Sequence, residues 1–261
     1  MGEVSYAPVI KDMVWSYSRI KAFEDCPYRW YLRYIRQLPG KDMFFANYGI
    51  FMHRLIEQHY SEGKTPGQLC DTYLRDFRKA VKGRAPNKKV FENYFKDGLA
   101  YLKSFKPLPY KVLCVEKKVE FNIDAIPLVG YIDYVGELDD EILVVDNKSR
   151  GLKPRSSRDK PTKTDEDLDN YLRQLYLYAV AVESEFGKRP KSLCFNCFRT
   201  SVFIEEPFRT NAYAESKKWL ADKVEEITYE TEFRPDMEYF KCRHLCEMND
   251  YCEYYSMSRK R

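Results

Sequence analysis

The sequence lacks the features that mark a membrane-spanning protein or a helicase motor. No run of apolar residues approaches the roughly 20 residues that a bilayer-spanning helix needs, so we expect no membrane partner. No phosphate loop of the form G-x-x-x-x-G-K-[ST] occurs, which argues against an ATP-driven motor within the chain. We also find no signal peptide, internal repeat or low-complexity tract, and we expect a cytoplasmic protein with one domain over residues 1–261.

The eight cysteines do not form the framework of a disulfide-stabilised secreted domain, and 261 residues can build a core without such staples. Three of them, Cys242, Cys246 and Cys252, fall within eleven residues, and Cys26 lies near the start. Such a dense group is typical of metal binding, and four thiolates suit either zinc or an iron–sulfur cluster. The other four cysteines are interpreted as packing residues: Cys70, Cys114, Cys194 and Cys197.

The net charge of +4 is too small to indicate a polyanionic partner by itself. The segment 148–163, however, contains seven basic residues and one acidic residue, Asp159. The basic residues are Lys148, Arg150, Lys153, Arg155, Arg158, Lys160 and Lys163. This local excess predicts phosphate contacts, with Arg150, Lys153, Arg155 and Arg158 as candidate nucleic-acid-binding residues. The alternative is a solvated, mobile loop.

The order of the predicted elements indicates an α/β protein. Ser18 is a candidate cap for a first helix, and Pro27 interrupts that helix beside Cys26. Helices are expected at 18–37, 48–60, within 67–104 with a break at 83–86, and at 168–186 and 210–230. Strands are expected at 111–122, 128–137, 141–148, 192–199 and 201–205, the first three as a meander.

The meander carries the most informative polar residues. Asp146 and Lys148 are two apart at the end of one strand, so they share a face, and Asp133 lies on the neighbouring strand. Two carboxylates suit Mg²⁺ or Mn²⁺, and an adjacent lysine is able to orient or help deprotonate a water molecule. This pattern favours phosphodiester hydrolysis. Taken alone, it is also compatible with exposed charges at strand ends.

Five motifs occur in an order that resembles the RecB-like nucleases of the PD-(D/E)XK superfamily. Gly130–Asp133 matches G-x-x-D, Asp146–Lys148 matches (D/E)-x-K, and Gln174–Tyr178 matches Q-x-x-x-Y. The segments 16–29 and 49–53 resemble the opening and the histidine motif of the same group. The terminal cysteines extend the resemblance to its iron–sulfur branch, which includes the AddB nuclease domain, CRISPR-adaptation exonucleases and phage exonucleases.

The resemblance implies a role for each matching residue. The catalytic Mg²⁺ or Mn²⁺ would be bound by His53, Asp133, Asp146 and the main-chain carbonyl of Asn147. Lys148 would activate or position water, and Gln174 and Tyr178, four apart on one helix face, would order the site and contact the substrate backbone. The alternatives are a hydrogen-bonded, partly buried His53 and a core-packing Tyr178. Glu57, on the same helix face as His53, is interpreted as surface charge.

The resemblance also implies a PD-(D/E)XK fold, with a central mixed sheet flanked by helices. Residues 16–60 would carry the first cluster cysteine and the histidine motif, 111–205 the catalytic sheet and helix, and 234–258 the cysteine group. A 4Fe–4S cluster on Cys26, Cys242, Cys246 and Cys252 would join the two ends of the chain. Their C-x3-C-x5-C spacing has one residue more in the first gap than is usual in this branch. The type of cluster is therefore undecided, and Zn²⁺ is the alternative metal.

The function expected from this resemblance is that of an exonuclease acting on single-stranded or end-frayed DNA in recombination, repair or phage DNA metabolism. The host would be a bacterial or phage-infected cell. Since the chain lacks a motor, a helicase, a recombinase or an integration complex is the expected partner. Two alternatives remain: a CRISPR-adaptation nuclease that trims DNA before integration, and a non-catalytic DNA-binding or inhibitory module.

Overall fold

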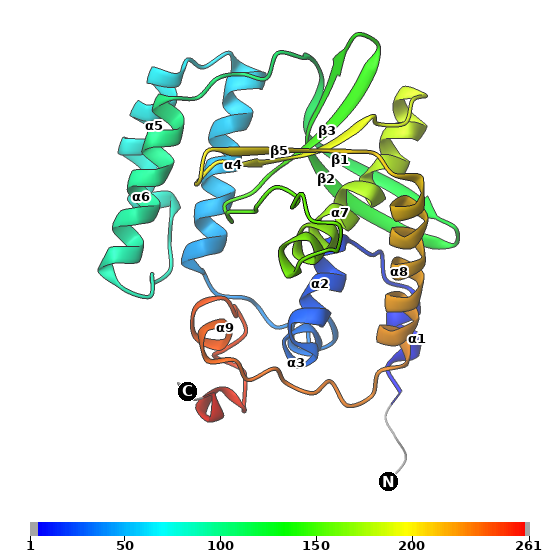
Figure 1. Cartoon of the computed structure of the whole chain (residues 1–261). Coiled ribbons are helices and arrows are strands. Elements are labelled where there is room, and N and C mark those ends of the chain that lie inside the picture. The colour runs from blue at the N-terminus through cyan, green and yellow to red at the C-terminus, as the bar shows by residue number, and fades with distance from the viewer. Residues whose placement is uncertain (1–4, 259–261) are drawn as a thin grey trace.

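The computed structural model describes residues 5–258, and its centre is a five-stranded sheet (Figure 1). The strands are β1 (Lys111–Ile123), β2 (Ile126–Leu138), β3 (Glu141–Asn147), β4 (Ser192–Cys197) and β5 (Val202–Pro207), in that spatial order. Only the β3–β4 pair is parallel, and the other neighbours are antiparallel. The expected α/β class, the mixed sheet and the three-stranded meander are confirmed.

Helices lie on both sides of this sheet (Figure 1). The crossover between the parallel strands β3 and β4 is α7 (Lys163–Phe186), which packs on one face with α8 (Thr210–Tyr229) beside it. The other side carries α4 (Phe44–Glu62), α5 (Pro66–Ala80) and α6 (Lys88–Lys103), which share a separate aromatic core. The shorter elements are α1 (Ala7–Lys11), α2 (Tyr17–Asp25), α3 (Pro27–Trp30), the π-helical turn η1 (Tyr31–Ile35), α9 (Tyr239–His244) and the 3₁₀ turn η2 (Tyr255–Met257). Among residues 5–258, no helix combines the length and apolar character that crossing a bilayer requires.

The predicted helix over 18–37 is three pieces in the structure. Ser16, not Ser18, is its N-cap, because the Ser16 side chain accepts a hydrogen bond from the Arg19 N–H. The chain is extended at Cys26, as expected for a residue that precedes proline, and a new helix starts at Pro27. Cys26 therefore lies in a corner between α2 and α3.

The helix α7 begins five residues before the predicted start at 168. Thr162 caps it, and Asp165 completes a capping box by accepting hydrogen bonds from the Thr162 N–H and hydroxyl at 2.7 Å each. The same buried carboxylate accepts the N–H and hydroxyl of Ser156, also at 2.7 Å. Four hydrogen bonds keep the pKa of Asp165 far below its usual range. The polar segment after β3 is thus fastened to the start of α7.

The two faces of the sheet contact different layers. Ile142 and Val144 of β3 pack with Leu172 and Leu175 of α7, whereas Leu143, Val145 and Cys194 face the α4 side. Cys197 belongs to the α7-facing core. Cys194 and Cys197, which are three residues apart, therefore point to opposite faces of the sheet. Alternation along β3 sends Asp146 towards α7 and the side chain of Asn147 towards α4.

Candidate active site

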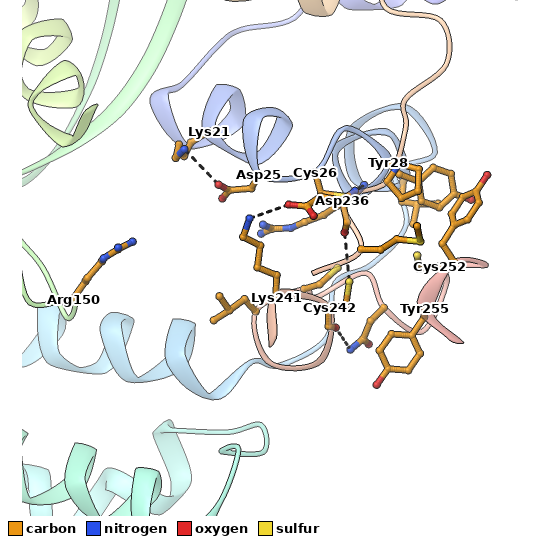
Figure 2. Close-up of a pocket in the computed structure, with 18 of the residues that line it drawn as sticks. Lys21, Asp25, Cys26, Tyr28, Arg150, Asp236, Lys241, Cys242, Cys252 and Tyr255 are labelled. Atoms are coloured by element: carbon orange, nitrogen blue, oxygen red, sulfur yellow. Dashed lines mark hydrogen bonds and ion pairs between the residues drawn. The ribbon is translucent and has the colours of Figure 1, made fainter. Parts of the chain in front are cut away.

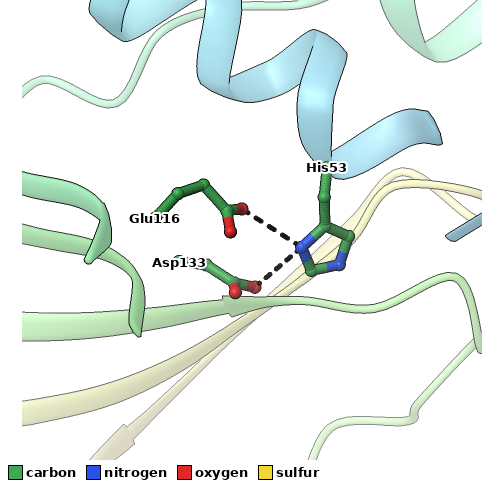
Figure 3. Close-up of side chains that lie close together, drawn as sticks. All are labelled: His53, Glu116 and Asp133. Carbon is green, nitrogen blue, oxygen red and sulfur yellow. Dashed lines mark hydrogen bonds and ion pairs between the residues drawn. The ribbon is translucent and has the colours of Figure 1, made fainter. Parts of the chain in front are cut away.

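Three ligand groups from three separate elements meet at one point. His53 projects from α4, Glu116 from β1 and Asp133 from β2 (Figure 3). The His53 Nδ1 atom lies 3.3 Å from Glu116 Oε1 and 3.5 Å from Asp133 Oδ2. The ligand atoms of the three side chains all lie within 4.8 Å of one another, and they form the one such group among residues 5–258. An imidazole with two carboxylates is a donor set that fits Mg²⁺ or Mn²⁺.

Glu116 occupies an unusual backbone position. Its φ is +44°, a left-handed conformation that costs a residue with a Cβ atom on the order of 1–3 kcal/mol. The strand pairing continues on either side, at Val115↔Tyr134 and Lys117↔Ile132. The strand thus accommodates a local irregularity that brings the Glu116 carboxylate beside Asp133.

The main chain of Asn147 links this group to β3. The Asn147 N–H donates a hydrogen bond to Asp133 Oδ2 at 2.6 Å, and its carbonyl oxygen lies 2.8 Å from His53 Nε2. Burial lowers the pKa of His53, but hydrogen bonds and the charges of Asp133 and Glu116 outweigh burial and raise it well above its usual value. Both ring nitrogens of His53 thus face oxygen atoms, Nδ1 the two carboxylates and Nε2 the Asn147 carbonyl.

The second half of the site faces α7. Lys148 Nζ lies 2.7 Å from Asp146 Oδ2 and donates a hydrogen bond to Gln174 Oε1 at 2.9 Å. Gln174 Nε2 in turn donates to the Tyr178 hydroxyl at 3.3 Å, and Tyr178 packs against Gly130. A Cβ atom at position 130 would lie 2.4 Å from a Tyr178 ring carbon, so only glycine allows this approach. Packing against Tyr178 therefore explains why the first residue of the G-x-x-D motif is glycine.

Asp146 is the most deeply buried carboxylate of the site. Burial raises its pKa to about 6, against the opposing effect of the Lys148 charge, and the neighbouring Asp133 carboxylate raises it further. Its Oδ2 forms the ion pair with Lys148 but accepts no well-directed hydrogen bond from the described residues. A buried oxygen with an unused lone pair fits a metal ligand.

All seven residues predicted for the catalytic and metal sites line one cavity of about 530 Å³. They are His53, Asp133, Asp146, Asn147, Lys148, Gln174 and Tyr178. Glu116 lines it too, and the sequence analysis did not single it out. A signal was present: counting back from the turn pair Asn122↔Pro127 in an antiparallel hairpin places Glu116 opposite Asp133. Glu57 lies outside the three-residue group, although it is near enough for the Glu116 charge to raise its pKa, after the larger effect of burial.

The basic segment after β3 has two kinds of side chain. Arg150 is exposed, lines the cavity and donates a hydrogen bond to the Tyr171 hydroxyl at 2.8 Å, and Lys153 and Arg158 are also exposed. Arg155 instead forms ion pairs with Asp169 at 2.6 Å and Glu206 at 2.8 Å. Arg155 is therefore engaged within the fold, and the other three cations are the accessible ones.

The four predicted cluster cysteines line a second cavity of about 310 Å³, between the α2–α3 corner and the segment around α9 (Figure 2). Cys26 Sγ accepts the N–H groups of Arg29 and Asp236 at 3.4 Å each. Burial raises the pKa of the Cys246 thiol to about 12 and raises those of Cys242 and Cys252. No three of these sulfur atoms lie within 4.8 Å of one another in the described chain.

Ion pairs around the buried Glu247 carboxylate hold the same two segments together. Glu247 accepts from Arg29 at 2.7 Å and from Arg33 at 2.6 Å, and the Lys41 N–H donates to the Glu247 main-chain carbonyl at 3.1 Å. Burial raises the pKa of the Glu247 carboxyl, but the Arg29 and Arg33 contacts outweigh it and lower the pKa. Figure 1 shows α9 beside α3.

The spacing of these residues has counterparts in known proteins. The sequence model of the PD-(D/E)XK nuclease superfamily matches residues 14–253, which include the active-site cavity and all four cluster cysteines. The chain belongs to the PD-(D/E)XK nuclease superfamily. The family prediction made from the five motifs is confirmed.

Two further similarities agree with this assignment. A segment of 89 residues is 34% identical to an ATP-dependent helicase/nuclease subunit from Ligilactobacillus salivarius (strain UCC118), and it spans 32% of this chain but only 6% of that relative. The crystal structure of a candidate exonuclease from Eubacterium rectale matches 100% of this chain and 95% of its own, with a TM-score of 0.51 and 12% identity. The second similarity shows a shared fold.

Glu116 provides a test of the three-ligand group. Glu116→Gln removes one charge while keeping the side-chain shape, so we expect Mn²⁺ affinity to fall by about 10- to 100-fold. The measurement is isothermal titration with Mn²⁺, and the control is Glu57→Gln, which makes the same change outside the group. Equal Mn²⁺ affinity in Glu116→Gln and Glu57→Gln would remove Glu116 from the site.

Proposed function

We propose that the protein is a divalent-metal-dependent deoxyribonuclease that acts as an exonuclease on single-stranded or end-frayed DNA. The observation that supports it best is the meeting of His53, Glu116 and Asp133 beside the Asp146–Lys148 pair in one open cavity. A decayed, non-catalytic module would be expected to lose one of these groups. All are present and oriented towards one another.

The residues divide the reaction between them. His53, Glu116, Asp133, Asp146 and the Asn147 carbonyl would hold Mg²⁺ or Mn²⁺. The bound metal would polarise the scissile phosphate and lower the pKa of water. Lys148 Nζ, held between Asp146 and Gln174, is positioned to orient the attacking water and to stabilise charge on the phosphate oxygens. Gln174 and Tyr178 fix the lysine rather than contact the reacting atoms.

The partner is inferred from what the chain lacks. The relative from Ligilactobacillus salivarius is named as a helicase/nuclease subunit, whereas this chain contains no phosphate loop. We infer that a helicase, recombinase or integration complex supplies open ends. A role in trimming DNA before integration would use the same chemistry.

Activity assays with variants test the catalytic assignment. Asp146→Ala and Lys148→Ala should lower cleavage of linear DNA by about 10²-fold or more in Mg²⁺ or Mn²⁺, because each removes a group that contacts the metal or water. The parent enzyme should not cleave circular DNA, because an exonuclease needs a free end. Asp222→Ala, an exposed carboxylate on α8, serves as control, and circular dichroism checks folding. Folded Asp146→Ala that cleaves at the parent rate would refute the assignment.

The basic segment is proposed to contact DNA phosphates through Arg150, Lys153 and Arg158. Replacing all three with Ala should weaken binding of a single-stranded oligonucleotide in Ca²⁺ and reduce the log–log salt slope by about two, since each of three lost phosphate contacts contributes about 0.7 to the slope on a single strand. Arg155→Ala, which breaks the ion pairs with Asp169 and Glu206, should lower the melting temperature and leave the salt slope unchanged. An unchanged slope in the triple variant would show that these side chains make no phosphate contacts and that the segment is a solvated loop.

The four thiols are proposed to hold a 4Fe–4S cluster that joins the two ends of the chain. A single tetrahedral zinc with Zn–S bonds of about 2.3 Å needs all four sulfurs roughly 3.8 Å apart. The four thiols line one cavity, and no three of their sulfur atoms lie within 4.8 Å of one another among the described residues, so metal analysis has to decide between one zinc and a cluster. The cluster would be structural, since its cavity is separate from the three-ligand group.

Metal analysis tests this assignment independently of activity. Protein purified without oxygen should contain iron and acid-labile sulfide, and Cys26→Ser should lose both and melt at a lower temperature. Cys114→Ser, a thiol in β1 away from the cavity, should retain both. Stoichiometric zinc without iron would reject the cluster.

A further inference from the structure

A third cavity adjoins the metal group from the α4 side of the sheet. Its volume is about 360 Å³, within the range of pockets that bind small organic groups. It shares Glu116, Asp133 and Asn147 with the active-site cavity, so these residues form the common wall of the two. A nucleotide whose phosphate contacts the metal group therefore has its base or sugar within reach of this cavity.

The lining of this cavity is aromatic. Tyr60, Tyr101 and Phe105 form a connected group, with ring centroids 6.3 Å apart for Tyr60 and Phe105 and 5.7 Å apart for Tyr101 and Phe105. Phe203 on β5 lies opposite Asn196 in the antiparallel pair, so its side chain is on the same face as the cavity. Phe203 is 39% exposed and, within residues 5–258, stacks on no other ring.

Two amides add a polar edge. Asn196 Nδ2 donates hydrogen bonds of 2.7 Å to the Tyr101 hydroxyl and to Asn147 Oδ1. These bonds orient the amides and leave Asn196 Oδ1 and Asn147 Nδ2 without a hydrogen bond among the described residues, one as acceptor and one as donor. A donor beside an acceptor is the pattern that nucleobase edges present.

The lining of this cavity has few cations, which favours a neutral base or sugar over a phosphate as occupant. Lys106, at the rim, is the one cation among the lining residues, all of which are described, whereas Glu57, Glu116 and Asp133 are acidic. The α7 side of the metal group, in contrast, carries Lys148 and Arg150. The two sides of the metal group thus match the two parts of a nucleotide. The cations on the α7 side suit its phosphate, and the rings and amides on the α4 side suit its base.

We propose that this cavity, which we name the base pocket, binds the nucleobase of a nucleotide next to the scissile phosphate, with the base stacked against Phe203 and its edge facing Asn196 and Asn147. The inference rests on the proposed nuclease function. Every base is able to stack on an aromatic ring, so the pocket would position an unpaired strand relative to the metal without selecting a base sequence. A base in a duplex cannot enter it, which makes the base pocket a selector for single strands.

Photocrosslinking with 5-iodouracil tests the proposal without relying on cleavage. Single-stranded oligonucleotides that carry one 5-iodouracil at successive positions are bound to the full chain in Ca²⁺ and irradiated, and adducts are mapped by mass spectrometry. We expect adducts on Phe203 or Tyr60 from one or two adjacent positions only. Adducts spread evenly along the oligonucleotide, or none on the base pocket, would overturn the inference.

Matched variants complete the test. Phe203→Ala should weaken oligonucleotide binding about fivefold or more and abolish the position-specific adduct, whereas Phe203→Tyr should retain both. Tyr229→Ala removes another exposed ring, 64% exposed at the end of α8, and should bind as the parent does. Parent-like binding by Phe203→Ala in a protein that still cleaves DNA would reject the base pocket and leave the nuclease proposal standing. A parent protein that neither binds nor cleaves nucleic acid would overturn both.

Discussion

The structure depends on keeping two buried carboxylates, Asp133 and Asp146, at the end of a hydrophobic sheet. A buried ionised carboxylate is costly unless charge or hydrogen bonds compensate it. Here Asp133 accepts a hydrogen bond from the Asn147 N–H and lies beside the His53 ring, and Asp146 forms an ion pair with the Lys148 ammonium. His53 comes from α4, and Asn147 and Lys148 come from β3 and the residue after it, so both elements must be in place before the site exists.

This requirement explains the placement of the surrounding layers. Helix α4 brings His53 over one side, and α7 brings Gln174 and Tyr178 over the other, where the absence of a side chain at Gly130 lets Tyr178 approach. The same division gives the site a cationic side and an aromatic side. Farther away, the Glu247 ion pairs and the thiol cavity fasten the α2–α3 corner to the segment around α9. That corner precedes α4 in the chain, so fastening it restricts where α4 can lie.

Much of this arrangement was predictable from local sequence, and the rest was not, for identifiable reasons. Alternation in 111–148 predicted the meander and the shared face of Asp146 and Lys148, because strand periodicity is a local property. The start of α7 was missed because its first turn is polar, and the capping box of Thr162 and Asp165 was the signal. Glu116 depends on a left-handed φ inside a strand, and Arg155 on acids that are distant in sequence, Asp169 and Glu206. The Arg155 contacts have no local pattern, whereas the pairing of Glu116 with Asp133 follows from counting along the hairpin and was overlooked.

The central claim is that one divalent cation is bound where α4, β1 and β2 meet. The most direct measurement is anomalous X-ray scattering from a crystal soaked in Mn²⁺. The account predicts a strong peak within coordination distance of His53, Glu116 and Asp133, on the side that faces Asp146. A Mn²⁺ peak at another place, or no peak at a Mn²⁺ concentration that supports cleavage, would contradict this claim.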